Sequence, residues 1–366
     1  MRLCRALIVP LWLTVGALAA EPKPELLFQL PLTPAALTVT PEGGYLLGLS
    51  FEGEPQNRVI AINRSGESSP FPTTKISQAD PEEALVLDAV EGLQSMDNGM
   101  VWMLDNGRRT ELAPKVIAWD VKRARLHRVF PLTQPATVAG SLLVEMAVAT
   151  DQAFVYLADP AAGADAALIV LDTNTGLARR VLQGHPSVVP VAGLELTING
   201  APVETKRLDG KPSMPKGGVG PLALDRKGEW LYFGPVRSHR LYRIKTASLR
   251  DAVCSGDELA GQVEEYSEKP VCDGITLDSK GNIYISDLAA KAIGMIAVGS
   301  KEYRTLATDT RFLWPDGLCF DADGRLCFFT DAHKASPQME ARGDVSPEGT
   351  NYLFRLQTPA SGRVGD

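Results

Sequence analysis

The chain has 366 residues, of which 37 are Lys or Arg and 44 are Asp or Glu, so its formal net charge is −7. An acidic balance without any block of Lys and Arg argues against a nucleic-acid partner, because nucleic-acid surfaces require a basic footprint. No segment after the first twenty residues approaches 18 consecutive apolar residues, so no membrane span is predicted.

The first twenty residues have the layout of a secretory signal peptide. Arg2 and Arg5 precede an apolar run, and small residues stand at Ala17 and Ala19. Cleavage near Ala19 or Ala20 would release residues 21–366 as one exported domain. We therefore expect a secreted protein, either periplasmic or extracellular.

A pattern of two strands then recurs along the chain. Each copy is a short apolar strand, a polar turn that usually contains Asp or Gly, and a second apolar strand, which is hairpin chemistry because Gly supplies the positive φ of the turn. The copies are residues 36–50, 92–107, 146–160, 220–235, 274–287 and 317–331. A third strand follows each copy, at 58–62, 115–121, 167–172, 240–244, 292–298 and 352–356, and a fourth follows several, such as 126–132, 177–182 and 302–307.

Six four-stranded units with no long helical pattern between them predict an all-β fold, a six-bladed β-propeller with four-stranded blades. The last unit has only three strands, so we expect residues 25–32 to become its fourth strand and close the ring. Residues 184–217, between the third and fourth blades, form an insertion. We expect it to make an extra hairpin over one face, as a lid, as a contact surface for a protein partner, or as decoration.

Acidic residues mark both ends of the inner hairpins. In a propeller blade, the residue before the first strand and the residue after the second strand lie on the same face. Four blades carry an acid before the first strand, and we name these the leading carboxylates: Glu91, Glu145, Asp273 and Asp316. The same four blades carry an acid after the second strand, and we name these the trailing aspartates: Asp105, Asp159, Asp287 and Asp331.

The leading carboxylates should converge near the mouth of the central channel. Converging carboxylates repel one another where solvent is limited, so a cation or protons must offset their charge. We therefore expect them to bind Ca²⁺ or another divalent cation, which accepts irregular cages of oxygen ligands. Ordinary turn chemistry of Asp-Gly is the alternative explanation.

Further residues on the same face are candidates for contact with a small-molecule ligand: Asp105, Asp159, Asp287, Asp331, His333 and Trp314. The alternative for the aspartates is the capping of loops. For His333 the alternative is an exposed loop position.

Four cysteines remain after the first twenty residues, and an exported chain permits disulfides. We expect Cys254 to pair with Cys272, which would close a loop beside the fifth unit. Cys319 and Cys327 should face each other across a hairpin, and two buried free thiols are the alternative to a disulfide there.

The ordered series of segments resembles the Yellow/major royal jelly protein family. The segments that carry the resemblance include LQSMDNGMVWMLDNG, PKVIAWDV, GPLALDRKGEWLYFGPVRSHRLYRI, CDGITLDSKGNIYISDL and LWPDGLCFDADGRLCFFTD, and the resemblance runs from about residue 90 to 356. It implies an exported six-bladed propeller, and the signal peptide and the short loops indicate a compact, bacterial-type member. The roles of the family are heterogeneous, including melanin-pathway chemistry, the binding of small amines and nutrition.

The chain is also distantly similar to gluconolactonase-like propellers, which hold a divalent cation on the channel axis and hydrolyse sugar lactones. Asp273-Gly274 stands where the final axial ligand of that group lies. Ala36, Glu145 and Gly220 depart from the other positions of its pattern.

Two functions follow as expectations. The first is an enzyme for lactone or ester hydrolysis, in which the cation polarises a carbonyl or a bound water and Asp273 or Asp316 acts as general base. The second is a non-catalytic protein whose acidic face binds an amine or a polyol. An interaction scaffold that uses residues 184–217 is a third, weaker alternative.

Overall fold

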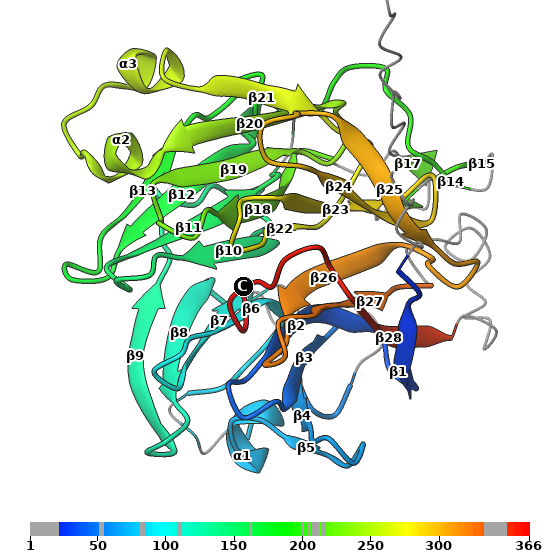
Figure 1. The fold of residues 1–366 in the computed structure, drawn as a ribbon. Helices are drawn as coiled ribbons and strands as arrows, with labels where there is room; N and C mark the ends of the chain where they lie inside the picture. Colours follow the sequence, from blue (N-terminus) through cyan, green and yellow to red (C-terminus); the bar gives the residue numbers. More distant parts are fainter. Residues whose placement is uncertain are drawn as a thin grey trace, which may run out of the picture.

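The computed structural model describes residues 22–50, 55–80, 83, 85–107, 112–161, 163–198, 201–203, 205–206, 212–213, 217–332 and 350–366. Within these residues, six four-stranded antiparallel sheets follow one another around a ring (Figure 1). The fold is therefore a six-bladed β-propeller, and the predicted fold class is confirmed. The predicted signal peptide, residues 1–20, lies outside the described residues.

The first three blades follow the predicted order of strands. Blade 1 contains β2 (Pro34–Val39), β3 (Tyr45–Leu49), β4 (Val59–Ile62) and β5 (Ser68–Pro70), and α1 (Thr74–Ser77) follows it. Blade 2 contains β6 (Val90–Ser95), β7 (Met100–Asp105), β8 (Lys115–Asp120) and β9 (Arg125–Pro131). Blade 3 contains β10 (Glu145–Val148), β11 (Phe154–Asp159), β12 (Ala167–Asp172) and β13 (Ala178–Val181), with a 3₁₀ turn at Gly163–Asp165.

The insertion and the other three blades complete the ring. Two short hairpins, β14 (Thr197–Ile198) with β15 (Ala201–Pro202) and β16 (Thr205–Lys206) with β17 (Pro212–Ser213), form in the insertion. Blade 4 contains β18 (Val219–Leu224), β19 (Trp230–Pro235), β20 (Arg240–Lys245) and β21 (Glu264–Glu268), with α2 (Thr246–Arg250) and α3 (Gly256–Ala260) before its last strand. Blade 5 contains β22 (Ile275–Leu277), β23 (Ile283–Asp287), β24 (Ala292–Ile296) and β25 (Tyr303–Thr308). Blade 6 contains β26 (Pro315–Phe320), β27 (Leu326–Thr330), β28 (Asn351–Leu356) and β1 (Glu25–Leu30).

The ring closes through blade 6, as the sequence predicts. β1 pairs antiparallel with β28, so that the first described strand forms the outer edge of the last blade. Glu25 also accepts a hydrogen bond of 2.8 Å from Arg355 of β28. This pairing covers the free edge of a three-stranded sheet and joins the two ends of the chain.

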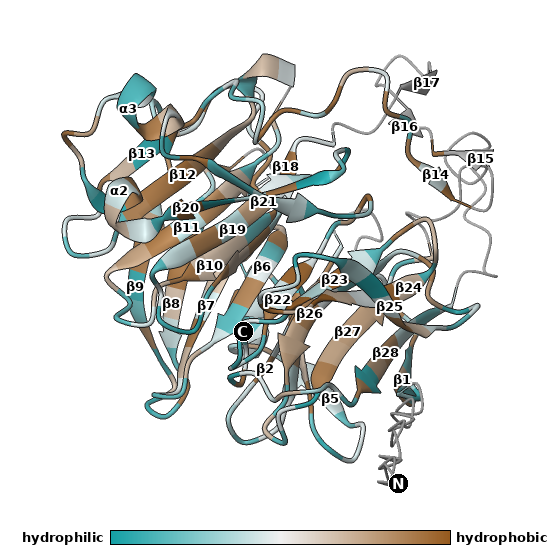
Figure 2. Cartoon of the chain, turned by 45° about the horizontal axis from the view of Figure 1, so that its top comes forward, coloured by the Kyte–Doolittle hydropathy of each residue, from teal (hydrophilic) through white to brown (hydrophobic). Residues whose placement is uncertain are grey.

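The core lies between the blades. Every residue of β7, β23 and β27 is buried, because each inner sheet has a neighbouring blade on both of its faces. Figure 2 shows apolar residues along these inner strands, whereas outer strands such as β9 are largely exposed. Tyr156 of β11 and Tyr284 of β23 are fully buried, so the rings of both side chains pack within the core.

The predicted disulfide between Cys254 and Cys272 is wrong, since both thiols are free. Cys254 packs at the edge of the core between blades 3 and 4, whereas Cys272 is buried in the core between blades 4 and 5. Sequence spacing gives the length of the loop between two cysteines but not the direction of their side chains. Cys319 and Cys327 are direct partners in the register of β26 and β27, as expected, and they too are free and buried.

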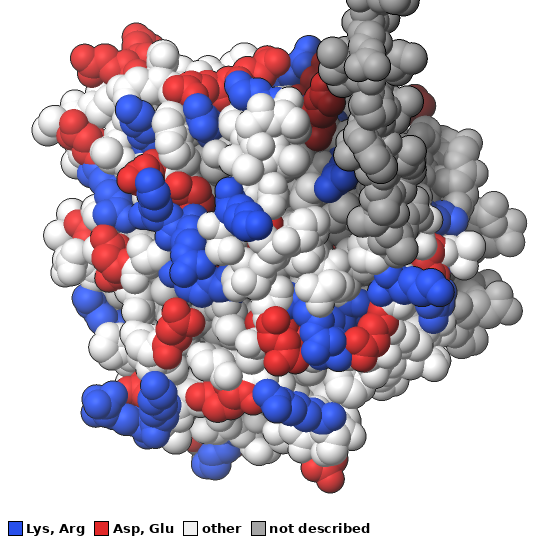
Figure 3. Space-filling model, viewed as in Figure 1, with Lys and Arg blue, Asp and Glu red and all other residues white. Residues whose placement is uncertain are grey.

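Charged side chains of both signs lie on the surface. On the face seen in Figure 3, basic and acidic side chains lie interspersed. The pairs Arg243–Glu264 and Arg240–Glu268 join β20 to β21, and exposed pairs of this kind contribute little to stability. Among the described residues, no helix has the length and apolar character that a membrane span would need.

Candidate functional site

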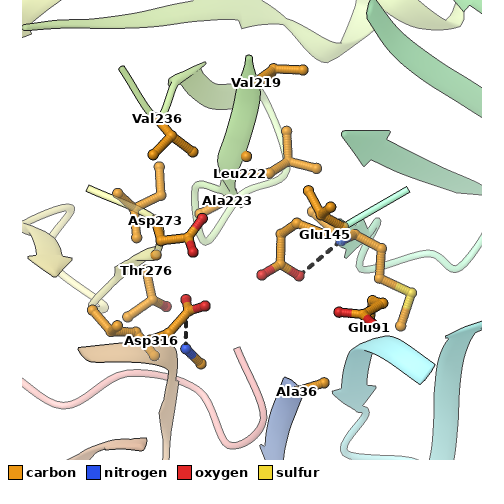
Figure 4. Close-up of a pocket in the computed structure, with 18 of the residues that line it drawn as sticks. Ala36, Glu91, Glu145, Val219, Leu222, Ala223, Val236, Asp273, Thr276 and Asp316 are labelled. Carbon is orange, nitrogen blue, oxygen red and sulfur yellow. Dashed lines mark hydrogen bonds between the residues drawn. The ribbon is translucent and has the colours of Figure 1, made fainter. Parts of the chain in front are cut away.

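The four leading carboxylates line a single cavity on the propeller axis. Its volume is about 420 Å³. Figure 4 shows the lining positions in blade order around the ring, and the carboxylates of Glu91, Glu145, Asp273 and Asp316 turn into the space between them. Blades 1 and 4 contribute Ala36 and the apolar residues Val219 and Leu222 instead. The strand geometry thus places acids from distant parts of the sequence at one site.

Local backbone groups orient two of these carboxylates. The Asp316 carboxylate accepts a hydrogen bond of 2.9 Å from the N–H of Gly317, and the Glu145 carboxylate accepts one of 2.8 Å from the N–H of Met146 (Figure 4). Gly274 stands directly against Asp316, since a Cβ atom there would lie 2.8 Å from Asp316 Oδ1. The glycine of the Asp-Gly pair therefore lets carboxylates of neighbouring blades approach each other.

Trp314 positions Asp273. The indole Nε1–H of Trp314 donates a hydrogen bond of 2.8 Å to Asp273 Oδ2. Trp314 has a φ of +48°, a left-handed conformation that is uncommon for a residue with a bulky side chain. Strained residues of this kind persist where the surroundings fix them, and they are concentrated at functional sites.

The insertion supplies those surroundings. Leu196 and Ile198 are buried in an apolar cluster with Trp314, and Val236 of blade 4 packs against the same cluster. Leu196 also lines the axial cavity. The described part of the insertion is therefore a wall of the cavity mouth, and it holds the indole that contacts Asp273.

Two trailing aspartates are buried and fully engaged in local contacts. Asp105 accepts a hydrogen bond of 2.7 Å from Lys115 and further bonds from backbone N–H groups of the loop before β6. Asp159 accepts bonds from Arg180 (2.6 Å), Ser141 and the N–H of Leu142. These contacts hold the loops that precede the inner strands.

The other trailing aspartates have similar settings. Asp287 accepts hydrogen bonds from Tyr303 (2.9 Å) and from the N–H of Ala290. Asp331 is 2 % exposed. The residues that line the axial cavity do not include Asp105, Asp159, Asp287 or Asp331. Their ligand-binding role stays a prediction, and the role predicted for His333 falls on a residue outside the described part of the chain.

The cavity also contains residues that the repeat pattern does not reveal. Arg237, in the loop after β19, is a single basic side chain among the described lining residues, which also include five acids. The side chain of Thr276 is almost fully buried and lies beside Asp316 (Figure 4). The far end of the cavity is lined by Gln94 and by Gly365 and Asp366 of the last segment of the chain. Only Arg237 has a sequence signal, since it directly follows the trailing end of an inner hairpin.

The leading carboxylates have the chemistry of a metal site but not its spacing. Carboxylate oxygens suit Ca²⁺, which takes six to eight ligands at about 2.3–2.6 Å. Among the described residues, however, no group of three or more His, Cys, Asp or Glu side chains stands close enough to hold one ion. As positioned here, the leading carboxylates do not form a metal cage.

Comparison with known proteins decides the family. Residues 85–335, which run from the start of blade 2 into blade 6, match the family described as major royal jelly protein. The chain belongs to the major royal jelly protein family. The resemblance seen in the sequence is therefore confirmed. A separate comparison with curated proteins found no match.

This major royal jelly protein family member is similar in fold to solved propellers of other families. A calcium-binding regucalcin from Agrobacterium tumefaciens is 13% identical, with a TM-score of 0.57 over 94% of this chain and 96% of that one. A gluconolactonase from Xanthomonas campestris is 13% identical, with a TM-score of 0.54 over 94% of both chains. A virginiamycin B lyase from Staphylococcus aureus is 16% identical, with a TM-score of 0.51 over 92% of this chain and 99% of that one. At identities this low, the similarity shows a common fold but not a common activity.

Proposed function

We propose that this protein is an exported binding protein that holds a small, positively charged organic molecule in its axial cavity. The positive group of the ligand lies among Glu91, Glu145, Asp273 and Asp316, and its apolar body lies along the aliphatic walls below them. The observation that carries the proposal is the convergence of acids from four blades on one cavity.

The composition of the cavity supports a cationic ligand. Five carboxylates and one arginine are among its described lining residues, so its charge is strongly biased toward acid. Fields in a concave, partly apolar site are focused, because low-dielectric walls screen them less than water does. Leu93, Met146 and Ile275 offer apolar contact area to the body of the ligand.

The walls of the mouth support specific recognition of a small molecule. Asp273 is held by Trp314, and Trp314 is held by the apolar cluster of the insertion. A carboxylate that is oriented in advance binds its partner without a further loss of conformational freedom. This role at the cavity also favours the insertion as part of a ligand site over a surface for a protein partner.

Hydrolysis of a lactone or ester that depends on a divalent cation is the second candidate. It is supported by the carboxylate donors and by the similarity in fold to a calcium-binding regucalcin and a gluconolactonase. The spacing of the carboxylates in the described residues speaks against it. The general-base roles predicted for Asp273 and Asp316 belong to this candidate.

Export rests on the layout of residues 1–20. Expression of the full chain in a bacterial host, followed by N-terminal sequencing of the secreted fraction, tests it. We expect the mature chain to begin close to Glu21. A protein retained in the cytoplasm with Met1 intact would contradict export and leave the cavity proposal untouched.

The ligand proposal is tested by calorimetric titration with a panel of primary amines, polyols and sugar lactones, with EDTA and with added CaCl₂. Asp273→Asn removes one charge from the mouth, and Asp257→Asn, at the exposed start of α3 in blade 4, is the matched control. We expect amines to bind without added metal, and Asp273→Asn to weaken this binding about tenfold while Asp257→Asn leaves it unchanged. Lactone turnover that EDTA abolishes, without amine binding, would replace the proposal with the second candidate.

A further inference from the structure

The axial cavity has a polar floor as well as an acidic mouth. After β28, residues 357–366 run back to the centre of the ring, where Figure 1 marks the end of the chain. Val364 bridges Phe320 at the far end of β26, and the carbonyl of Gly365 accepts a hydrogen bond of 3.3 Å from Thr38 of blade 1. Asp366 lines the same cavity as the leading carboxylates. The segment therefore closes the channel at the end opposite to the mouth.

Asp366 is tied to the floor through one oxygen of its carboxyl group. Oδ1 accepts hydrogen bonds from Gln94 Nε2 (2.9 Å) and from an Arg363 guanidinium nitrogen (2.7 Å). Gln94 is itself fixed, because its Oε1 accepts a bond of 2.7 Å from the N–H of Val148. Within the described residues no donor reaches Oδ2, and the side chain is 20 % exposed. Oδ2 is thus an acceptor that remains for a further donor.

The chemical state of this carboxyl group also differs from that of an exposed aspartate. Burial raises the pKa of the Asp366 carboxyl, while the Arg363 guanidinium and the Gln94 amide act in the opposite direction. Arg363 already offsets the charge of the Asp366 carboxyl group. This group therefore acts at the floor as a hydrogen-bond acceptor more than as a second strong anion. A ligand group that donates a hydrogen bond, either a hydroxyl or an ammonium, satisfies it.

The mouth and the floor are separated by an apolar stretch of defined length. Gln94 lies three residues beyond Glu91 on β6, and Leu93 between them lines the cavity. At about 3.3 Å per strand residue, the two levels are at most roughly 10 Å apart, because the register of β6 shifts at Glu91. Contacts of about 2.8 Å at each end leave roughly 5 Å between the two donors of a ligand.

From this arrangement we infer that the ligand is a short linear amine with a second hydrogen-bond donor at its far end, an α,ω-diamine or an amino alcohol. The amine lies among the leading carboxylates, the methylene chain contacts Leu93 and its neighbours, and the distal donor binds Asp366. This inference rests on the proposed cationic ligand and narrows it to a class. Asp366 is then the residue that selects for ligand length and for the distal group.

The test is a series of calorimetric titrations with purified protein. The ligands are the diamines from 1,3-diaminopropane to 1,8-diaminooctane, the monoamines of equal length, and 4-amino-1-butanol. We expect 1,3-diaminopropane, 1,4-diaminobutane and the amino alcohol to bind at least tenfold more tightly than the matching monoamines, with weaker binding for the longer chains. The proteins are the wild type, Asp366→Asn, and Asp323→Asn as an exposed control on a turn of blade 6.

The variant Asp366→Asn tests the contribution of the floor while the leading carboxylates at the mouth stay unchanged. Its amide NH₂ has to face the cavity, because Gln94 and Arg363 both need an acceptor, so the distal donor of the ligand loses its partner. We expect this variant to bind diamines and monoamines equally, with monoamine affinity unchanged and thermal unfolding like that of Asp323→Asn. If Asp366→Asn does not fold, the length series in the wild type still decides the matter.

The outcomes are distinguishable. Equal affinity of monoamines and diamines in the wild type at every length overturns the inference and leaves the cationic-ligand proposal standing. An absence of binding for every amine overturns both. A diamine advantage that survives Asp366→Asn shows that another group recognises the distal donor, and it overturns the role of Asp366.

Discussion

The leading and trailing acids of the same blades have different fates. Both sets stand at the same face and at the two ends of the same hairpins. The leading carboxylates line a cavity, whereas Asp105 and Asp159 are enclosed by loop N–H groups and by one cation each. The difference follows from position, because the first strand of each blade faces the axis and the second lies one strand further out.

This contrast teaches that an acid at a blade end is not a functional signal by itself. A carboxylate that accepts several local hydrogen bonds has its charge satisfied by the fold and contributes to stability. A carboxylate on the axis lies with acids from other blades around one cavity, where a ligand can reach it. Predictions for the two sets therefore concern different measurements.

The largest expected effect is the loss of folding stability when a trailing aspartate is replaced. Asp159→Ala removes the partner of Arg180, whose side chain is only 5% exposed, and leaves a buried cation unpaired. We expect the free energy of unfolding to fall by about 3–5 kcal/mol. Urea denaturation measures this, with Asp97→Ala on an exposed turn as the control. A loss below about 1 kcal/mol, combined with a loss of ligand binding, would reverse the assignment of roles.

The second effect is a loss of amine affinity when the residue that orients Asp273 at the cavity mouth is replaced. Trp314→Phe retains an aromatic ring in the apolar cluster but removes the N–H that orients Asp273. We expect amine affinity to fall about tenfold, which corresponds to about 1.4 kcal/mol, because the Asp273 carboxylate is then no longer oriented in advance. Titration calorimetry is the measurement. Unchanged affinity in a folded variant would show that Asp273 does not depend on the indole.

The smallest effect is the pH dependence of the floor. Because burial raises the pKa of Asp366 above 3.8, the folded state favours its neutral form. Its contribution to stability is fully present below pH 3.8 and is lost as the pH rises through the raised pKa. We therefore expect wild-type protein to lose stability relative to Asp366→Asn over this rise. Parallel free-energy profiles of the two proteins across that pH range contradict the prediction.

Much of the fold could be predicted from the sequence, because strand, turn and strand recur in a fixed order. The apolar runs that become β7, β11, β23 and β27 stand out since both of their faces are buried. The closure by β1 follows from the missing fourth strand of the last blade. Side-chain direction was not predictable to the same degree, as the free Cys254 and Cys272 show.

The site could be predicted only where it follows the repeat. The leading carboxylates have a fixed place in each unit, so their convergence is a matter of strand geometry. Asp366 and Leu196 have no such place, because a tail and an insertion bring them to the cavity by packing between distant segments. Arg237 could be located at the same face, but its position inside the cavity could not.

The central claim is that the leading carboxylates bind a positive charge, and a charge-matched pair of ligands tests it most directly. The measurement compares the calorimetric affinity of butylamine and of butanol for wild-type protein and for the double variant Glu145→Gln, Asp273→Asn. We expect the amine to bind at least tenfold more tightly than the alcohol in the wild type and no better than the alcohol in the double variant. Equal affinities for the two ligands in the wild type, or an amine preference unchanged by the double substitution, would contradict the account.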